Sequence, residues 1–371
     1  MIARMLWIAL LIAVAAVAVA VHLDRQSRVD PFLAKHVPAP FRYFAQGQVA
    51  VEAIDSGDAA SMLEEGRRLV RRRPLPAGNL LLLAIAQEQA GHHADAARSM
   101  QAAARRGWRI PEVQHAGLLN AVAAGAMDEA GYRLAALWAL SDDAGLRDTL
   151  TRTVLADPAA AEAFGGILGG SPGWRNRFLA RYSAADAPPR LVEAVAAANR
   201  AGTDFDCAAL SALARSFALR GNAASARTLW SGKCARRGHA AEPGGAGFTP
   251  EPDGAPGPFD WSYGGQPGLT VSAGDAGLDY DNRTFGTQLV ASRLVSLSPG
   301  NRLLTLTSAG GGGLIEVRIA CGDASGRKSR LASRVGEGAL PFTVNAASCP
   351  IAEISVHGGR GSRRGLTLTL R

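Results

Sequence analysis

The chain has 371 residues, of which 47% are hydrophobic and 19% charged, and a formal net charge of +8. This length allows two domains with buried cores, and the apolar share excludes a generally disordered chain. The positive charge is almost all arginine, because only Lys35, Lys233 and Lys328 are lysines, and the basic runs "RRLVRRR" and "GGRGSRRG" are short. Since no nucleic-acid recognition motif accompanies these runs, we expect solvated surface and no nucleic-acid partner.

Residues 1–24 form the first predicted element, a transmembrane signal anchor. The uncharged run "LWIALLIAVAAVAVAV", residues 6–21, is at the lower limit of length for crossing a bilayer and above that of a signal-peptide core. A cleaved signal peptide is the alternative, since "AVA" at 18–20 would suit a signal peptidase, but no clear polar cleavage region follows. Basic residues on both sides of the run leave its orientation open.

Residues 43–236 are predicted to form an α-helical repeat domain. Gly57, Gly91 and Gly125 lie 34 residues apart, and each is followed at fixed distances by small or apolar side chains. This period is typical of helix hairpins in which glycine makes the turn. The region resembles the tetratricopeptide repeat (TPR) family, a solenoid of stacked hairpins, and the resemblance implies that it docks an envelope protein; a rigid spacer is the alternative. The period is lost from 145 to 200, where we expect irregular helical packing.

The four cysteines predict the compartment. Cys207 lies fourteen residues before a further turn glycine, Gly221, and Cys234 lies thirteen residues after it. Residues equidistant from the turn of an antiparallel hairpin face each other, so these two cysteines can be bridged. Cys321 and Cys349 share the C-terminal module and are predicted to form the second disulfide. Two pairs indicate an oxidising compartment. We therefore predict a single-pass protein of the bacterial inner membrane with the bulk of the chain in the periplasm; free thiols in a cytoplasmic chain are the alternative.

A proline- and glycine-rich linker at 237–258 precedes an expected antiparallel β-sandwich at 259–371. Short alternating runs recur without helical stretches between them, which excludes a parallel α/β fold. The module has "FDW" at its entrance, "GLDYDNRTFGTQLVASRLVSLSPGNRLLTLTS" in its middle, and "IEVRIACGD" paired with "SCPIAEISVHG". In these features it is similar to the carbohydrate-binding-module-like jelly rolls that follow tetratricopeptide repeats in some proteobacterial envelope proteins, including ones associated with exopolysaccharide production. The fold class expected for the whole chain is α+β and multidomain.

The resemblance implies sugar binding, in which aromatic rings lie flat against pyranose rings beside polar neighbours. Trp261, Tyr263 and Tyr280 are the only Trp or Tyr residues of the module, and Asp279 and Asp281 flank one of them. These five residues are the predicted glycan-binding candidates.

A structural role for the same residues is the alternative, with Trp261 plugging the entrance of the sandwich and residues 279–282 forming a turn. We predict no metal site, no cofactor and no catalytic residues, because the chain has no Walker, HExxH or CxxC motif. The expected function is that of a non-enzymatic scaffold in exopolysaccharide or surface glycan assembly or export. A polysaccharide-processing hydrolase or lyase and a purely structural spacer are the alternatives.

Overall fold

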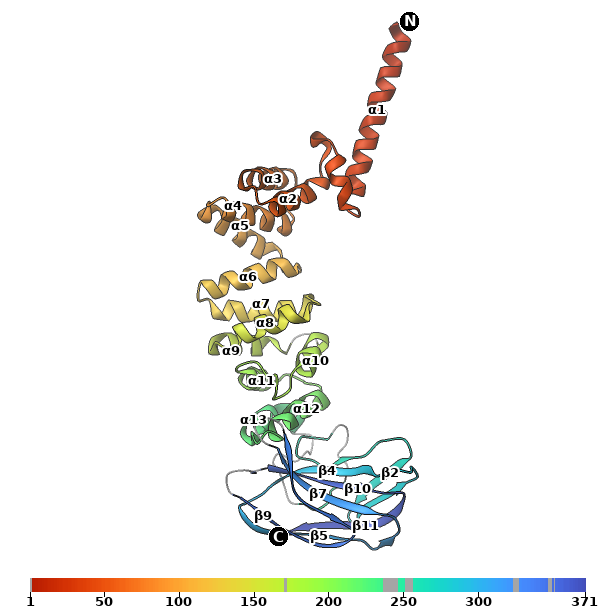
Figure 1. Ribbon diagram of the computed structural model, residues 1–371. Helices are drawn as coiled ribbons and strands as arrows, with labels where there is room; N and C mark the ends of the chain where they lie inside the picture. The colour runs from red at the N-terminus through yellow and green to blue at the C-terminus, as the bar shows by residue number, and fades with distance from the viewer. Residues whose placement is uncertain are drawn as a thin grey trace. The chain divides into compact units, whose positions relative to one another are not determined.

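The computed structural model of the chain (Figure 1) describes residues 2–169, 172–235, 246–250, 256–322, 327–345, 349 and 351–371. Within these residues the protein is α+β, with helices first and antiparallel strands after them. The helices are α1 (Ile2–Gln26), η1 (Pro31–His36), η2 (Ala39–Phe41), α2 (Ala45–Ser56), α3 (Ala59–Arg72), α4 (Ala77–Gln89), α5 (His93–Arg106), α6 (Pro111–Ala123), α7 (Met127–Leu140), α8 (Ala144–Val154), α9 (Pro158–Ile167), α10 (Pro172–Arg181), α11 (Leu191–Arg200), α12 (Cys207–Ala218), α13 (Ala223–Leu229) and α14 (Gly232–Ala235).

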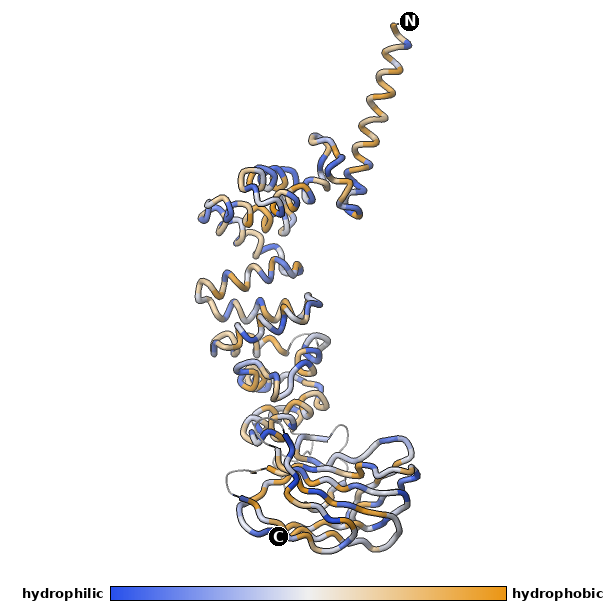
Figure 2. Tube along the Cα trace, viewed as in Figure 1, coloured by the Kyte–Doolittle hydropathy of each residue, from blue (hydrophilic) through white to orange (hydrophobic). Residues whose placement is uncertain are grey.

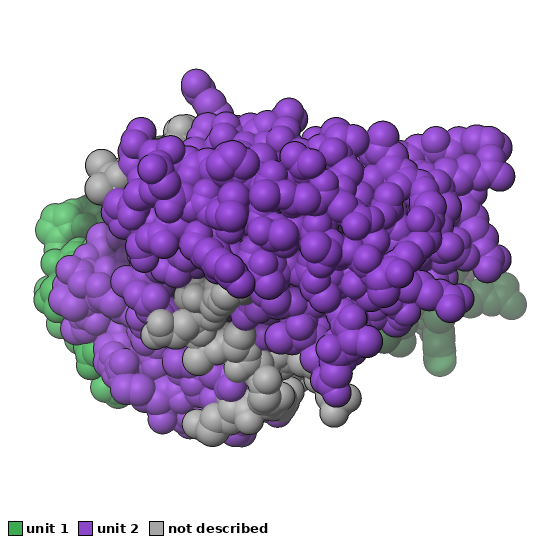
Figure 3. All heavy atoms as spheres, turned by 90° about the horizontal axis from the view of Figure 1, so that it is seen from below, with its two compact units in different colours: residues 1–147 green, residues 148–371 purple. Residues whose placement is uncertain are grey.

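The strands follow in the C-terminal third of the chain. They are β1 (Ser262–Tyr263), β2 (Leu269–Gly274), β3 (Gly277–Asn282), β4 (Gln288–Ser296), β5 (Gly300–Thr307), β6 (Gly310–Gly311), β7 (Ile315–Gly322), β8 (Lys328–Val335), β9 (Gly338–Val344), β10 (Ile351–Gly358) and β11 (Gly361–Leu370). The chain divides into two compact units, residues 1–147 and 148–371 (Figure 3).

The apolar run near the N-terminus forms one continuous helix. Among the described residues, α1 is the one helix long and apolar enough to cross a membrane. Hydrophobic residues follow one another along most of it (Figure 2). Its side chains from residue 2 to residue 19 are all exposed. By length and composition, α1 therefore qualifies as a membrane span or signal anchor.

Glycine makes the turns of the helix hairpins in residues 1–147. α2 packs on α3, α4 on α5 and α6 on α7, while α4 also contacts α2 and α6. Gly57, Gly91 and Gly125 follow the first helix of each hairpin with φ of 75°, 76° and 70°. Glycine enters this left-handed region without the strain that a Cβ would bring. The turn positions predicted from the sequence are therefore confirmed.

Both predicted disulfides are present in residues 148–371. Cys207 at the start of α12 is bridged to Cys234 in α14, with their Cα atoms 5.5 Å apart. Cys321 near the end of β7 is bridged to Cys349, at a Cα separation of 5.6 Å. Gly221, with φ of 78°, turns the chain between α12 and α13 as the spacing predicted. Each bridge closes a loop inside one unit, which limits the freedom of the unfolded chain.

Two antiparallel sheets pack face to face in the C-terminal part, which we call the two-sheet module (residues 256–371). In the described residues, the strand order is β1-β4-β10-β7-β8 in one sheet and β2-β3-β11-β5-β9 in the other, with β6 beside β11. Val317 and Ile354 of the first sheet share one core with Leu278, Leu304 and Leu368 of the second. Alternation along each strand puts these apolar residues inside and polar residues outside.

The structure corrects the interpretation of residues 279–282 as a turn. They belong to β3, in which Leu278, Tyr280 and Asn282 are buried and the residues between them face outward. Asp279 and Asp281 made the run look like a turn, but they occupy the solvent side of a strand. The predicted linker 237–258 lies largely outside the described residues.

Helices and sheets meet within residues 148–371, across the boundary predicted between the repeat domain 43–236 and the module 259–371. Arg215 of α12 pairs with Glu353 of β10. A Cβ placed on Gly322 would lie only 1.5 Å from the carbonyl oxygen of Leu219. Because Gly322 allows this close approach, the C-terminal helices sit directly against the first sheet.

Candidate functional site

The outer face of the first sheet carries a cluster of polar side chains. Along β7 and β10 every second residue enters the core, so that the residues between them point outward. The strand register places Ser355 opposite both Arg318 of β7 and Ser292 of β4, and places His357 opposite Glu316. Antiparallel pairing thus brings together side chains that are far apart in the sequence.

These side chains surround a hollow of about 380 Å³, which we call the sheet hollow. Its lining is Leu289, Ser292, Arg318, Ala320, Lys328, Arg330, Glu353, Ser355 and His357. Three cations outnumber one carboxylate, and two serine hydroxyls and an imidazole complete the polar lining. A hollow with this lining suits a small anionic group that also bears hydroxyls.

Glu353 ties two neighbouring elements to the sheet hollow. Its Oε1 lies 2.9 Å from Nη2 of Arg215 in α12, and its Oε2 lies 2.5 Å from Nζ of Lys328 in β8. Arg215 also donates to Oγ of Ser292 at 3.2 Å. Helix α12 is therefore fixed beside the hollow by a charged network that is mostly shielded from solvent.

Arg318 and Arg330 differ in how their guanidinium groups are occupied. Arg318 donates through Nε and Nη2 to the two carboxylate oxygens of Glu316, each at 2.7 Å. Arg330 is exposed and makes no hydrogen bond or ion pair to another residue in the part of the chain that the structure describes. Arg330 is thus the cation of the hollow whose donors are most available to a ligand.

The environment of the titratable groups around the hollow shifts their pKa values and so decides their charge at neutral pH. Burial raises the pKa of Glu353, but hydrogen bonding and charge from Lys328 and Arg215 outweigh burial, so that this pKa is lowered. The hydrogen bonds from Arg318 lower the pKa of Glu316. Burial, and then the charge of Arg318, lower the pKa of His357 below its usual 6.5. Both carboxylates are therefore ionised and His357 is neutral at pH 7.

Two of the predicted glycan-binding aromatics are packed into the entrance of the module. Trp261 is 1% exposed, its Nε1 donates to the carbonyl oxygen of Gly247 at 2.7 Å, and its ring lies 4.6 Å from that of Phe248. The half-buried ring of Tyr263 stacks on Trp261 at 6.5 Å, and its hydroxyl donates to the carbonyl oxygen of Thr249. Both rings contact protein on at least one side, and Trp261 has no face open to solvent.

The other three candidates lie together on the second sheet. Tyr280 is 3% exposed, and burial raises the pKa of its hydroxyl. Asp279 accepts from the backbone N–H of Gly365 at 2.7 Å, and Asp281 pairs with Arg283 at 2.9 Å. They border a smaller hollow of about 250 Å³, which we call the second hollow and which is lined by Thr270, Ser272, Asp279, Tyr280, Asp281, Ser362, Arg363 and Arg364. The structure therefore separates these candidates from Trp261 and Tyr263, which belong to the entrance of the module.

The residues predicted from the sequence do not include the sheet hollow or one exposed aromatic residue. Phe285 is 91% exposed in the loop between β3 and β4, with the guanidinium carbon of Arg360 4.5 Å from its ring centroid. The predicted aromatic candidates are the Trp and Tyr residues of the module and do not include Phe285. The signal for the hollow was the alternation of charged and apolar residues in "IEVRIAC" and "IAEISVH".

The helix hairpins of residues 1–147 carry a separate, mostly apolar groove of about 480 Å³ between α4, α5 and α6. Ile85, Met100 and Leu119 line it, with Glu88 and His93 in an exposed pair at 2.8 Å. His93 therefore has a carboxylate neighbour rather than a set of metal ligands. The described residues contain no group of three or more His, Cys, Asp or Glu that could hold a metal ion.

No protein-family model matches the chain, and a comparison with curated proteins found no match. Its class is therefore stated from the structure alone. It is an α+β protein with an apolar N-terminal helix, helix hairpins, two disulfides and two packed antiparallel sheets.

Proposed function

We propose that the chain is a non-catalytic, membrane-anchored scaffold of the bacterial cell envelope that binds an acidic polysaccharide at the sheet hollow. In this proposal α1 holds the protein in the inner membrane and the rest of the chain lies in the periplasm. The helix hairpins dock a protein partner in the groove between α4, α5 and α6. The role is in exopolysaccharide or surface glycan assembly or export. The observation that carries the proposal is the cationic, hydroxyl-lined sheet hollow.

The chemistry of the hollow supports an acidic sugar as its ligand. A uronate residue offers one carboxylate and several hydroxyls within one ring. Guanidinium groups such as that of Arg330 recognise carboxylates with charge-assisted hydrogen bonds, while Ser292 and Ser355 can exchange hydrogen bonds with sugar hydroxyls. The volume of about 380 Å³ lies within the usual range of small-molecule sites.

The charges at the hollow favour binding over hydrolysis. A glycoside hydrolase needs one protonated carboxylic acid whose pKa is raised and one ionised partner. Glu316 and Glu353 both have lowered pKa values and both are paired with cations. Neither carboxyl group is placed to donate a proton at neutral pH. A polysaccharide-processing enzyme is therefore the weaker alternative at this hollow.

Retention on an acidic polysaccharide tests the proposed ligand. The full chain in detergent is expected to be retained on immobilised polygalacturonate but not on neutral dextran. Arg330→Gln should weaken this retention by about tenfold, because it removes one charge-assisted hydrogen bond with little effect on internal contacts. The retention should also fall with added salt.

Arg364→Gln is the matched control, because Arg364 is an exposed arginine of the second hollow on the other sheet. It should leave retention unchanged. Loss of retention with Arg364→Gln but not with Arg330→Gln would place the ligand in the second hollow. Absence of wild-type retention on polygalacturonate would refute acidic-glycan binding.

Fusion reporters test the proposed compartment. Alkaline phosphatase fused after Arg371 should be active in a Gram-negative host, because the enzyme needs the oxidising periplasm to form its disulfides. A green fluorescent protein at the same position, exported through the same route, should be dark. A bright fluorescent fusion together with an inactive phosphatase would reject the periplasmic orientation.

A further inference from the structure

The apolar part of α1 is short for a bilayer. The apolar residues 5–21 make seventeen residues, which at 1.5 Å each give about 26 Å of helix. The hydrocarbon core of a bilayer is about 30 Å thick. A span that is too short draws flanking residues into the interface. The protein surface that surrounds the last turns of α1 should therefore meet the lipid headgroups.

The chain turns back after α1 and packs beside those last turns (Figure 1). Leu23 packs against Ala34 and Val37 in a small core that also includes Ala45, and Ala20 is buried. We call residues 27–44, which contain η1 and η2, the collar. Since η1 and η2 contact α1, Leu23 packs in this core and Ala20 is buried, the collar lies at the level where the apolar run ends.

Asp24 locks the collar to α1. Its Oδ1 accepts the backbone N–H groups of Tyr43, Phe44 and Ala45 at 2.8, 2.9 and 2.9 Å. These are N–H groups at the start of α2, where no side chain of the first turn caps the helix. Asp24 is only 5% exposed, so its carboxylate is hidden from lipid. Asp24 can thus lie at the membrane–water interface without exposing its carboxylate to lipid.

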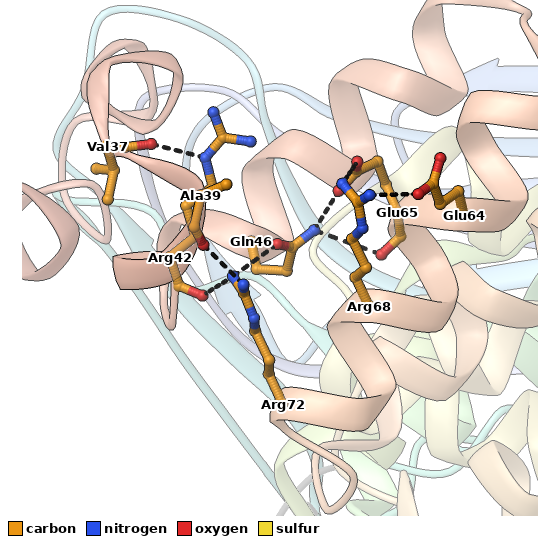
Figure 4. Close-up of polar contacts among 8 residues, drawn as sticks. All are labelled: Val37, Ala39, Arg42, Gln46, Glu64, Glu65, Arg68 and Arg72. Carbon is orange, nitrogen blue, oxygen red and sulfur yellow. Dashed lines mark hydrogen bonds and ion pairs between the residues drawn. The ribbon is translucent and has the colours of Figure 1, made fainter.

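A second network fixes the collar to α2 and α3 (Figure 4). Arg72 of α3 donates to the carbonyl oxygen of Ala39 at 2.7 Å, to Oε1 of Gln46 at 3.0 Å and to the carbonyl oxygen of Arg42. Nε of Arg42 donates to the carbonyl oxygen of Val37 at 2.7 Å. Gln46 in turn donates to Glu65 at 2.6 Å. The collar is therefore a defined surface and keeps its position relative to α1.

That surface combines exposed apolar groups with the cations Arg28 and Lys35 and the exposed carboxylate of Asp30, and Phe32 and Lys35 border a hollow that Glu52 and Asp55 of α2 also line. Val29 is 85% and Phe32 64% exposed. Nζ of Lys35 lies 3.7 Å from the ring centroid of Phe32, and the guanidinium carbon of Arg28 lies 4.7 Å from that of Phe44. Within the described residues, neither Arg28 nor Lys35 forms an ion pair with a carboxylate. Aromatic and basic side chains together are typical of the headgroup layer, and anionic lipids attract such cations.

We propose that the collar is a lipid-binding surface, in which Val29 and Phe32 enter the interface and Arg28 and Lys35 bind the phosphates of anionic phospholipids. This inference rests on the proposed function only in that α1 must cross a membrane. The collar adds contact with the headgroup layer that an apolar run of about 26 Å does not supply by itself, and it fixes the first hairpin against the membrane surface.

Spin labels on the full chain in nanodiscs test the proposal. The described cysteines are all in disulfides, so that a single introduced cysteine gives one reactive thiol. Labels at Val14→Cys in α1, Phe32→Cys in the collar and Tyr132→Cys in α7 are compared in discs with phosphatidylglycerol. Accessibility to oxygen relative to a water-soluble nickel chelate should be highest at Val14 and several-fold higher at Phe32 than at Tyr132, which is 45% exposed. With Arg28→Gln and Lys35→Gln, or in discs of phosphatidylcholine alone, the ratio at Phe32 should fall while that at Val14 stays the same.

The three labels separate failure of the collar from failure of the anchor. A low ratio of oxygen to nickel accessibility at Val14, as for a residue in water, would refute the membrane span and with it the proposed function. A high ratio of oxygen to nickel accessibility at Val14, together with equal ratios at Phe32 and Tyr132, would overturn only the proposal that the collar binds lipid. A high ratio at Phe32 that does not respond to phosphatidylglycerol or to the two charge changes would overturn the binding of anionic phospholipid.

Discussion

Replacing Trp261 by alanine is expected to lower the local free energy of unfolding of the two-sheet module by about 3–5 kcal/mol, the usual cost of truncating a buried large aromatic. Trp261 is 1% exposed, packs against Phe248 and holds the carbonyl oxygen of Gly247 through its indole N–H. Alanine would leave a cavity at the entrance of the module and would remove one of two donors to the carbonyl oxygen of Gly247, to which Arg293 also donates at 3.3 Å. Hydrogen exchange of the backbone amides of β4 and β10 in the full chain measures this loss.

Phe285→Ala is the control for Trp261→Ala, because it removes an aromatic side chain of the same module that is 91% exposed. Its effect on exchange should be within about 0.5 kcal/mol. Tyr263→Phe, which removes only one hydroxyl, should cost about 1 kcal/mol. Equal exchange rates in Trp261→Ala and Phe285→Ala would show that the packing of Trp261 adds no stability.

Short repeating patterns in the sequence were sufficient to predict the turns of the helix hairpins and the strands of the sheets. The spacing of Gly57, Gly91 and Gly125 predicted the hairpin turns, because a helix pair of fixed length needs a left-handed residue at a fixed position. The distance of Cys207 and Cys234 from Gly221 also predicted their bridge, although α13 ends at Leu229 and Cys234 lies in the separate helix α14. Alternation in "LIEVRIAC" and "IAEISVH" predicted β7 and β10, since one face of each strand enters the core.

The candidate site could not be predicted in the same way, because it depends on contacts between distant segments. Ser292 and Ser355 become neighbours only through the pairing of β4 with β10, and Arg215 reaches Glu353 only because Gly322 lets α12 approach the sheet. Composition cannot distinguish a buried aromatic from an exposed one. The sequence therefore left Trp261 open between a sugar platform and a plug at the entrance of the sandwich, and it did not indicate the exposed ring of Phe285.

The collar shows the same limit at the other end of the chain. In the sequence, Asp24 is an ordinary polar residue after an apolar run. The first backbone N–H that donates to its side chain, that of Tyr43, lies nineteen residues later. Only the turn of the chain back along α1 makes it a cap for α2. Its substitution therefore tests a contact that no local pattern contains.

Asp24→Ala is expected to destabilise the junction of α1 and α2 by about 3 kcal/mol, because buried N–H groups lose a charged acceptor and the change exceeds the loss of an ordinary N-cap. The backbone N–H groups of Tyr43, Phe44 and Ala45 would be left without this partner. The start of α2 should then fray and release the collar from Leu23. Limited digestion of the full chain with trypsin measures this, because cleavage after Arg42 needs the local backbone to open.

Asp30→Ala is the control within the same collar, since Asp30 is an exposed aspartate that accepts only the N–H of Phe32, at 3.0 Å. It should change the free energy of opening by about 1 kcal/mol or less and cleavage after Arg42 only slightly. Asp24→Asn, which keeps one oxygen acceptor but loses the charge, should fall between Asp30→Ala and Asp24→Ala. If Asp24→Ala is cleaved no faster than Asp30→Ala, the three hydrogen bonds do not hold the collar, because packing around Leu23 and the Arg72 network would then be sufficient.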